Sequence, residues 1–395
     1  MRIAISGASG YIGQHLSSFL EGKGYDVIPL GRDLFKEDCF DELCRCVESC
    51  EVVINLAGAS INKRWTEAYK QELYDSRICV TRQLVHAINT RSVKLELFIS
   101  ASAVGYYPAF GEYDEYHDCR GMDFLARLCG AWEEEASACS SDVRLVITRF
   151  GVVLSEDGGA LKEMLRLQRF SRVSVVIGNG QQRFPWISLF DLCRSFGYII
   201  RNRQMRGVVN LVSPDLITQK QLAHTLARAD KIRRIIPLPE FFFRLKFGEG
   251  ASFVTKGQTV HPSKLQESGF TYIYPTIEKL MNITDHHTVP ELDIKRYMGR
   301  WYEIARYENH FERGMTDVTA TYTLLPDGKI RVENEGYKGG VHKKATGRAK
   351  QPDPKNNPGK LKVAFFLWFY ADYYILELDA DYQYAAVSYT HLRAH

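Results

Sequence analysis

Three glycines near the start of the chain have the spacing of a phosphate-binding turn. Gly7, Gly10 and Gly13 directly follow the apolar run at residues 3–6 and precede an amphipathic segment. In such a strand, turn and helix, the first glycine permits a tight turn, the second lets the backbone approach a pyrophosphate, and the third lets the helix pack on the sheet. The helix N-terminus adds free N–H groups and a partial positive charge. This pattern predicts a dinucleotide site, the alternative being glycines that serve only a tight turn. The other turn residues expected at the dinucleotide are Ser9, Tyr11 and Ile12.

The residues after a second apolar run bear on which dinucleotide would bind. Gly31, Arg32 and Asp33 follow the run from Asp26 to Leu30, about twenty residues after the glycine turn, where NAD enzymes place a carboxylate on the ribose 2′-hydroxyl. Arg32 after a glycine offers a fork of donors suited to a 2′-phosphate. NADP is therefore favoured, with NAD possible through Asp33. A solvated surface arginine is the alternative.

A third apolar run ends in a short polar and glycine-containing segment, Asn55-Leu-Ala-Gly58. In open α/β folds the cofactor lies at the carboxyl edge of the sheet, so we expect Asn55, Ala57 and Gly58 to contact it. A helix cap followed by a turn is the alternative interpretation.

The elements that would position these residues alternate between strand and helix up to about Arg201. We expect helices at Glu67 to Asn89 and Phe124 to Ala138. The expected strands are Arg2 to Ser6, Asp26 to Leu30, Val52 to Ala57, Leu95 to Ser100 and Arg144 to Phe150. This alternation predicts an α/β Rossmann-like fold, a doubly wound parallel sheet with helices on both faces.

The later part of the chain has a different pattern. Short mixed elements punctuated by prolines predict a small substrate-side lobe at 207–283, after a dinucleotide-binding domain at 1–206. A polar linker is expected at 284–290. Seven closely spaced strand-like runs then predict an antiparallel β-barrel at 291–388.

Composition excludes several classes of protein. The chain has 395 residues, 45% of them apolar, and a formal net charge of +4 with scattered basic residues, so we expect no nucleic-acid partner. Nine cysteines lack the paired spacing of a zinc site, so we expect reduced structural thiols and no metal. No stretch has the pattern of a secretion signal or is long enough to span a bilayer, so we expect a cytoplasmic protein with no transmembrane segment.

The motifs of the first part together resemble the extended short-chain dehydrogenase/reductase superfamily, and more closely its atypical branch called epimerase family protein, or cell-division-inhibitor-like. The resemblance covers approximately residues 1–283. It rests on the glycine turn, Asn55 to Gly58, Ser76-Arg77, Ser100 to Tyr107, Phe124 to Glu133, Arg149 to Leu154, Gly158 to Leu161, Gly178 to Gln181 and Trp186-Ile187 with Asp191.

This resemblance implies a mechanism in which a tyrosine acts as acid/base, a lysine four residues later lowers its pKa, and a serine binds the reacting carbonyl. Ser102 matches the serine, but Leu125 and Cys129 stand at the tyrosine and lysine positions. Tyr106 or Tyr107 could reach the site instead, each with the alternative of a packed aromatic at the pocket wall.

Two further residues are candidates for the substrate side. Arg149 ends a strand and could hold an anionic group, the alternative being a buried structural ion pair. Trp186 is the second candidate, although it and Asp191 look more architectural than catalytic. Cys129 reads as a core thiol rather than a nucleophile.

Residues 288–388 resemble bacterial lipocalins through the Gly299-Arg-Trp301 pattern and Asn334 to Tyr337. The resemblance implies a cavity for a fatty acid or lysophospholipid, and inward aromatics filling a solid core are the alternative. We expect the barrel to lack its last strand and residues 389–395 to be a non-native tail.

These observations predict an NAD(P)-dependent epimerase or oxidoreductase without the usual Tyr-x-x-x-Lys pair, fused to a lipid-binding module. Two alternatives remain: a regulatory protein that binds cofactor without turnover, and a lipocalin-type lipid binder as the main role. The sequence does not specify the small-molecule substrate.

Overall fold

The computed structural model describes residues 1–395 except 93–94, 282–287, 306–313, 356, 367–368 and 390–395. The chain divides into two compact units, Met1–Asn282 and Ile283–His395. The predicted linker at 284–290 and tail at 389–395 fall largely outside the described residues.

The first unit is built on a six-stranded sheet in the order β10-β6-β4-β3-β1-β2, in which every neighbouring pair is parallel. Its strands are β1 (Arg2–Ser6), β2 (Asp26–Leu30), β3 (Val52–Asn55), β4 (Leu97–Ala103), β6 (Arg144–Phe150) and β10 (Gly207–Leu211). The chain leaves β1 toward β2 on one side and returns to β3 on the other. This reversal creates a crevice at the carboxyl ends of β1 and β3, where open α/β folds bind their ligands.

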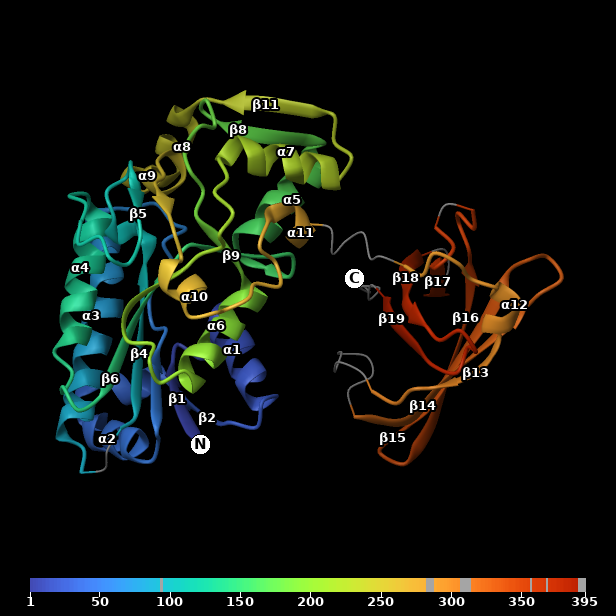
Figure 1. The fold of residues 1–395 in the computed structure, drawn as a ribbon, viewed down its shortest axis with the longest axis horizontal. Coiled ribbons are helices and arrows are strands. Elements are labelled where there is room, and N and C mark those ends of the chain that lie inside the picture. Colours follow the sequence, from blue (N-terminus) through green and yellow to red (C-terminus); the bar gives the residue numbers. More distant parts are fainter. Residues whose placement is uncertain (93–94, 282–287, 306–313, 356, 367–368, 390–395) are drawn as a thin grey trace. The chain divides into compact units, whose positions relative to one another are not determined.

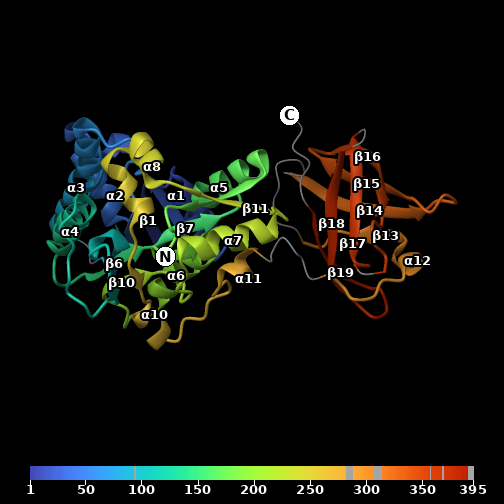
Figure 2. The same cartoon turned by 90° about the horizontal axis from the view of Figure 1, so that it is seen from above.

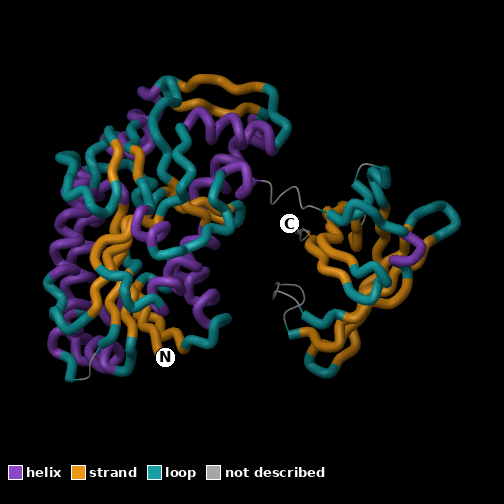
Figure 3. The backbone as a smooth tube through the Cα atoms, in the orientation of Figure 1, coloured by secondary structure: helices purple, strands orange, loops and turns teal. Residues whose placement is uncertain are grey.

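Helices cover both faces of this sheet, as the sequence predicts for strands that are apolar on both sides (Figures 1 and 3). Leu16 of α1 and Phe196 of α6 belong to the core on one face, and Leu43 of α2 and Leu84 of α3 to the core on the other. Figures 1 and 2 both place α3 beside α4. The helices are α1 (Tyr11–Glu21), α2 (Phe40–Glu48), α3 (Glu67–Thr90), α4 (Phe124–Ser137) and α6 (Leu189–Arg201).

Local capping explains where the two long helices start. Thr66 accepts a hydrogen bond from the N–H of Tyr69 at the start of α3. Asp123 accepts one from the N–H of Ala126 at the start of α4. A side-chain oxygen that satisfies an otherwise unpaired N–H stabilises a helix start by about 1 kcal/mol.

A smaller lobe lies above the carboxyl edge of the sheet in Figure 1. Its β8 and β11 form a parallel pair, and two further parallel pairs, β7 with β9 and β5 with β12, join the lobe to the sheet. The remaining strands are β5 (Glu112–Tyr113), β7 (Val152–Ser155), β8 (Val173–Ile177), β9 (Trp186–Ser188), β11 (Arg234–Leu238) and β12 (Thr259–Val260). The remaining helices are α5 (Gly159–Ser171), α7 (Gln219–Ala229), α8 (Glu240–Phe247), α9 (Ser252–Thr255), α10 (Ser263–Glu267) and α11 (Ile277–Met281).

The lobe does not begin at residue 207 as the sequence analysis expected. Residues 207–211 form β10 and pair with β6 inside the main sheet, whereas β8, at 173–177, already belongs to the lobe. Both differences arise because strand pairing depends on partners that are far apart in the chain.

The second unit contains one antiparallel sheet of seven strands in sequential order, curled as half of a barrel. Among the described residues, β13 and β19 each pair with a single neighbour. The elements are α12 (Ile294–Tyr297), β13 (Gly299–Tyr302), β14 (Met315–Leu324), β15 (Ile330–Lys338), β16 (Val341–Lys350), β17 (Lys360–Phe366), β18 (Phe369–Leu378) and β19 (Ala385–Tyr389).

Candidate functional site

The glycine turn forms a cradle at the carboxyl end of β1. Gly7 has φ +73°, and a Cβ there would lie 2.8 Å from the carbonyl carbon of Leu56. A Cβ on Gly13 would lie 2.2 Å from the carbonyl oxygen of Gly7. Gly10 donates its N–H to that same oxygen at 3.0 Å and is the N-cap of α1. The cradle therefore has no room for a side chain at Gly7 or Gly13 and presents the uncapped start of α1, an arrangement that binds phosphate.

The other predicted turn residues surround this cradle. Ser9 is exposed, and its carbonyl accepts a hydrogen bond from Gln14 Nε2 at 3.0 Å. Ile12 is half-buried against the core. The ring of Tyr11 lies against Gly158, where a Cβ would come within 2.3 Å of it. Because Gly158 is the N-cap of α5, Tyr11 brings the starts of two helices together.

Arg32 lies at the carboxyl end of β2 with an exposed side chain. Within the described part of the chain its guanidinium makes no hydrogen bond or ion pair. A Cβ on Gly31 would meet no atom within 4 Å, so the space beside Arg32 is open. The carboxylate of Asp33 instead pairs with Lys36 at 2.5 Å, and this hydrogen bond lowers the pKa of Asp33. Arg32 is thus the group at this edge that remains available to a ligand.

Asn55 ties the walls of the crevice together. Its side-chain oxygen accepts hydrogen bonds from Ser6 Oγ at 2.6 Å and from the N–H of Ala57 at 3.2 Å. Its amide nitrogen donates to Thr81 Oγ1 of α3 at 2.8 Å. Asn55 is fully buried, and its hydrogen bonds hold the segment containing Ala57 and Gly58 in place.

Ser102 does not face open space. Its hydroxyl donates to Glu133 Oε1 at 2.6 Å, and both residues are buried. The same carboxylate accepts two hydrogen bonds from Arg149, from Nε at 2.8 Å and from Nη2 at 2.7 Å. Burial alone would lower the pKa of Arg149, but the hydrogen bonds and charge of Glu133 raise it above its ordinary value. Arg149 therefore forms the buried ion pair that the sequence analysis gave as its alternative role, with Glu133 as the partner.

The two candidate tyrosines differ in their surroundings. The hydroxyl of Tyr107 donates to the carbonyl of Asp114 at 2.8 Å and contacts Asn210 Oδ1 at 3.1 Å, and the residue is only 2% exposed. Tyr106 is half-buried, stacks on the guanidinium of Arg149 at 3.5 Å, and donates to Asp118 Oδ1 at 3.3 Å. Burial raises the pKa of both phenols. Tyr106 is the one of the two that reaches a cavity.

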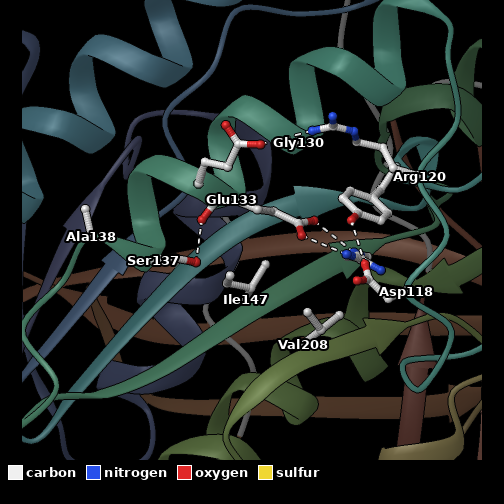
Figure 4. A pocket seen from close by; sticks show the side chains of 11 residues that line it. Asp118, Arg120, Gly130, Glu133, Ser137, Ala138, Ile147 and Val208 are labelled. Atoms are coloured by element: carbon white, nitrogen blue, oxygen red, sulfur yellow. Dashed lines mark hydrogen bonds and ion pairs between the residues drawn. The ribbon is translucent and has the colours of Figure 1, made fainter.

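That cavity has a volume of about 580 Å³ and lies between α4, β6 and β10 (Figure 4). In the figure, Asp118 and Arg120 lie at one end and Ser137 and Ala138 at the other. Further lining residues are Tyr106, Gly130, Glu133, Glu134, Ile147, Arg149 and Val208. The cavity thus combines an apolar wall with two ion pairs, Glu133 with Arg149 and Arg120 with Glu134.

Leu125 and Cys129, at the positions where the family resemblance implies a tyrosine and a lysine, cannot transfer a proton at neutral pH. Leu125 lies 3.4 Å from the Cβ that Gly105 would carry. Cys129 is 3% exposed, and burial raises its pKa to about 12, so it is a core thiol. Trp186 is fully buried among the apolar residues that α5, α7 and α11 contribute. Its indole therefore supports the lobe from within.

Sequence reasoning missed two residues. Glu133 was recognised only as part of a motif, and Arg77 only as part of Ser76-Arg77. A signal for Glu133 was available, because an acid on the apolar face of a helix requires a buried partner. Arg77 lies in the middle of α3, where its guanidinium donates to the carbonyls of Leu73 at 3.0 Å and Ala59 at 2.9 Å.

The inner side of the second unit carries a cluster of tyrosines. Tyr373 Oη lies 2.9 Å from Tyr297 Oη and accepts a hydrogen bond from Tyr322 Oη at 3.1 Å. The indole of Trp301 donates to the carbonyl of Tyr297 at 2.9 Å. All three tyrosines are buried.

Within the described ranges, no group of three or more His, Cys, Asp or Glu residues has the geometry to hold a metal ion. In these same ranges no helix is both long and apolar enough to cross a membrane.

Comparison with known families matches three parts of the chain. Residues 3–211 match the NAD dependent epimerase/dehydratase family, residues 238–282 a domain of unknown function, and residues 292–394 a lipocalin-like domain.

Individual relatives cover almost the whole first unit. Epimerase family protein YfhF of Bacillus subtilis is 34% identical over 307 residues, which are 73% of this chain and 100% of that protein. The chloroplastic homolog of epimerase family protein SDR39U1 from Arabidopsis thaliana is 33% identical over 297 residues, 70% of this chain and 85% of that protein. The crystal structure of human epimerase family protein SDR39U1 (isoform2) with NADPH superimposes with a TM-score of 0.66 at 32% identity, covering 72% of this chain and 99% of that one. This chain therefore belongs to the NAD dependent epimerase/dehydratase family, among the epimerase family proteins, and carries a lipocalin-like domain after the epimerase domain.

Proposed function

We propose that the first unit is an NADP(H)-dependent oxidoreductase or epimerase that acts on a small carbonyl or hydroxyl substrate. The observation that carries this proposal is the side-chain-free cradle of Gly7, Gly10 and Gly13 beside Arg32, whose guanidinium forms no ion pair with any described residue. A 2′-phosphate at Arg32 favours NADP over NAD, because a charge-assisted bond to a guanidinium needs an anion there. The NADPH in the structure of the human relative supports the same choice.

When bound, the nicotinamide supplies or accepts a hydride at a carbon that carries oxygen, and the protein must move a proton at that oxygen. The candidates for the group that transfers this proton are Ser102, Tyr106 and Tyr107. The hydroxyls of Ser102 and Tyr107 have buried partners, which supports positioning roles. A phenol with the ordinary pKa of about 10 is protonated at neutral pH, and burial raises the pKa of Tyr106 further. Its phenol therefore suits the reductive direction, in which an alkoxide takes up a proton.

The substrate-side candidates are still Arg149 and Trp186. The contacts of each side chain indicate which role it can have. Because Glu133 neutralises Arg149, we expect Arg149 to hold the ring of Tyr106 rather than to bind a substrate anion alone. Trp186 would shape the lobe that closes the substrate side.

The test is a turnover assay of the full chain with NADPH or NADP⁺ and a panel of nucleotide sugars and small carbonyls or alcohols. With a substrate in hand, Tyr106→Phe should lower kcat by roughly 10²-fold or more if this phenol is the acid/base. Tyr107→Phe is the matched control and should leave most of kcat in place. Full activity in both variants would move the role to another group or to water.

A second candidate function is an NADP(H) sensor without turnover. Leu125 and Cys129 favour it, because neither side chain can transfer a proton at neutral pH. Binding of NADPH without turnover of any substrate in the panel, in the unmodified chain, would favour the sensor over the enzyme.

For the second unit we propose binding of a fatty acid or lysophospholipid, on the strength of its lipocalin-like fold. The cluster of Tyr297, Tyr322 and Tyr373 supports the competing interpretation of a filled interior. Displacement of a fluorescent fatty acid by unlabelled lipid would separate the two, since a filled interior gives no saturable binding.

A further inference from the structure

Helix α8 follows β11 in the smaller lobe (Figure 1) and is packed on one side only. On the inner side, Phe247 is buried and Phe243, one turn before it, is half-buried. The N–H of Trp65 donates to the carbonyl of Phe247 at 3.1 Å and holds this side to the loop after β3. The opposite side, here called the outer face of α8, carries three apolar side chains that are 58, 45 and 69% exposed: Phe241, Phe242 and Leu245.

The three side chains of the outer face lie together. Phe241 and Leu245 are one turn apart, and the ring centroids of Phe241 and Phe242 are 4.0 Å apart. With about 3.6 residues per turn, the three positions span about 100° of the helix circumference. Arg244 borders this arc on one side and Lys246 on the other, and both are exposed. The outer face is thus an apolar strip between two cations, and exposed apolar side chains that gather in this way indicate a contact surface.

The charge around the outer face is positive. Arg64 Nη1 donates to the carbonyl of Leu245 at 3.4 Å, which brings a third cation to the end of the helix. The two acids that flank the helix in the chain are engaged elsewhere. Glu240 is half-buried toward the inner side, and Glu249 pairs with Lys70 at 2.5 Å. The outer face therefore suits a partner that presents negative charge around an apolar interior.

The size and the charge of this face distinguish between partners. A stable protein interface buries about 800 Å² on each partner, whereas α8 is only about 12 Å long. In a two-fold dimer the same face would meet itself, and the cations at its borders would repel one another. An anionic lipid surface needs only a few apolar side chains between its headgroups and acyl chains, with cations beside the phosphates. The pattern of α8 matches this third partner.

From this arrangement we propose that the outer face of α8 docks the first unit on an anionic lipid surface. Phe241, Phe242 and Leu245 enter the boundary between headgroups and acyl chains, and Arg244 and Lys246 lie at the lipid phosphates. The helix lies in the plane of that surface, since its inner side stays packed on the lobe. The proposal does not depend on the functions proposed above for either unit.

Cosedimentation of the full chain with lipid vesicles tests this docking. One set of vesicles contains phosphatidylcholine alone, and the other an equal mixture of phosphatidylcholine and phosphatidylglycerol. We expect the unmodified chain to bind the mixed vesicles at least about 10-fold more strongly, because only these carry net negative charge. Phe241→Ser combined with Leu245→Ser should weaken that binding by about 10-fold or more, since two apolar anchors are lost.

A second variant tests the charges separately. Arg244→Gln combined with Lys246→Gln should weaken binding to the mixed vesicles by about 10- to 30-fold and make the remaining binding less sensitive to salt. This variant keeps the apolar strip, so it also tests the proposal if the serine variant is unstable. Met122→Ser is the matched control, because Met122 is 90% exposed in the loop before α4. Its binding should equal that of the unmodified chain.

Three results would overturn the proposal. The first is no vesicle binding by the unmodified chain, or equal binding to both kinds of vesicle. The second is binding that both α8 variants retain in full, which would assign lipid contact to another part of the chain. The third is a dimer in sedimentation equilibrium that the serine variant converts to a monomer, because a second copy would then cover this face. Selective loss of binding to the mixed vesicles in both α8 variants would support the proposal.

Discussion

Glu133 of α4 and Arg149 of β6 form a two-pronged ion pair inside the first unit, with N–O distances of 2.8 and 2.7 Å. Both residues are less than 10% exposed. Ser102 donates a third hydrogen bond to the same carboxylate. The pair therefore joins α4 to two adjacent strands of the sheet.

Removing one member of this pair should be far more costly than removing both. Glu133→Gln leaves the charge of Arg149 buried without a counter-charge, and we expect it to lower the free energy of unfolding by about 3–5 kcal/mol. The double change Glu133→Leu with Arg149→Met should be less destabilising than either single change, because no charge remains. Urea unfolding of the single and double variants measures this. Additive losses would contradict the coupling.

Arg32 should set the preference between the two dinucleotides. Arg32→Ala should lower the affinity for NADPH by about 10- to 100-fold and leave that for NADH unchanged, because only NADPH carries the 2′-phosphate. Calorimetry with both cofactors checks this. Lys36→Ala is the control, since Lys36 already pairs with Asp33. Equal affinities for NADPH and NADH in the unmodified chain would refute the assignment.

The glycine cradle should reject even a methyl group. In Gly13→Ala the new Cβ would lie 2.2 Å from the Gly7 carbonyl oxygen, so the turn must open. We expect a loss of about 1–3 kcal/mol in stability, typical of overpacking, together with loss of measurable NADPH binding. Gly31→Ala is the matched control, because its Cβ enters open space, and its melting temperature should not fall. A Gly13→Ala variant with unchanged affinity would show that the ligand does not use this turn.

The tyrosine cluster of the second unit should make its stability sensitive to alkaline pH. Burial raises the pKa of Tyr322 and Tyr373 in the folded state. In the unfolded chain these phenols lose their protons near pH 10. Their contribution to the free energy of unfolding is therefore fully present below about pH 10 and decreases as the pH rises further. Tyr373→Phe should weaken this fall, whereas Tyr302→Phe, at a position 70% exposed, should not. Urea unfolding at a series of pH values checks it, and identical pH profiles for all three proteins would contradict it.

The sequence predicts local structure well where one short signal determines it. Strands β1, β2 and β6 begin and end at the predicted residues, because each is an apolar run between polar or glycine residues. The starts of α3 and α4 also match, since Thr66 and Asp123 are strong caps. These elements need no information about distant parts of the chain.

The relationships that depend on distant partners were not predictable in the same way. The pairing of β10 with β6, and of β8 with β11, joins segments more than fifty residues apart. The contacts of Glu133 with Ser102 and Arg149 arise only once α4 lies on the sheet. Residue spacing does not indicate which distant side chains come into contact. The sequence therefore identified Ser102 and Arg149 as candidates but not Glu133, which binds both of them.

The amide of Asn55 has a consequence for how the first unit responds to its ligand. One side chain links Ser6 on β1, Ala57 in the loop after β3, and Thr81 on α3. The two walls of the crevice thus cannot separate without breaking buried hydrogen bonds, and the crevice is preorganised before any ligand arrives. A ligand that enters it loses little free energy to ordering the protein. Conversely, a change that loosens β1 from β3 will weaken ligand binding and thermal stability in parallel.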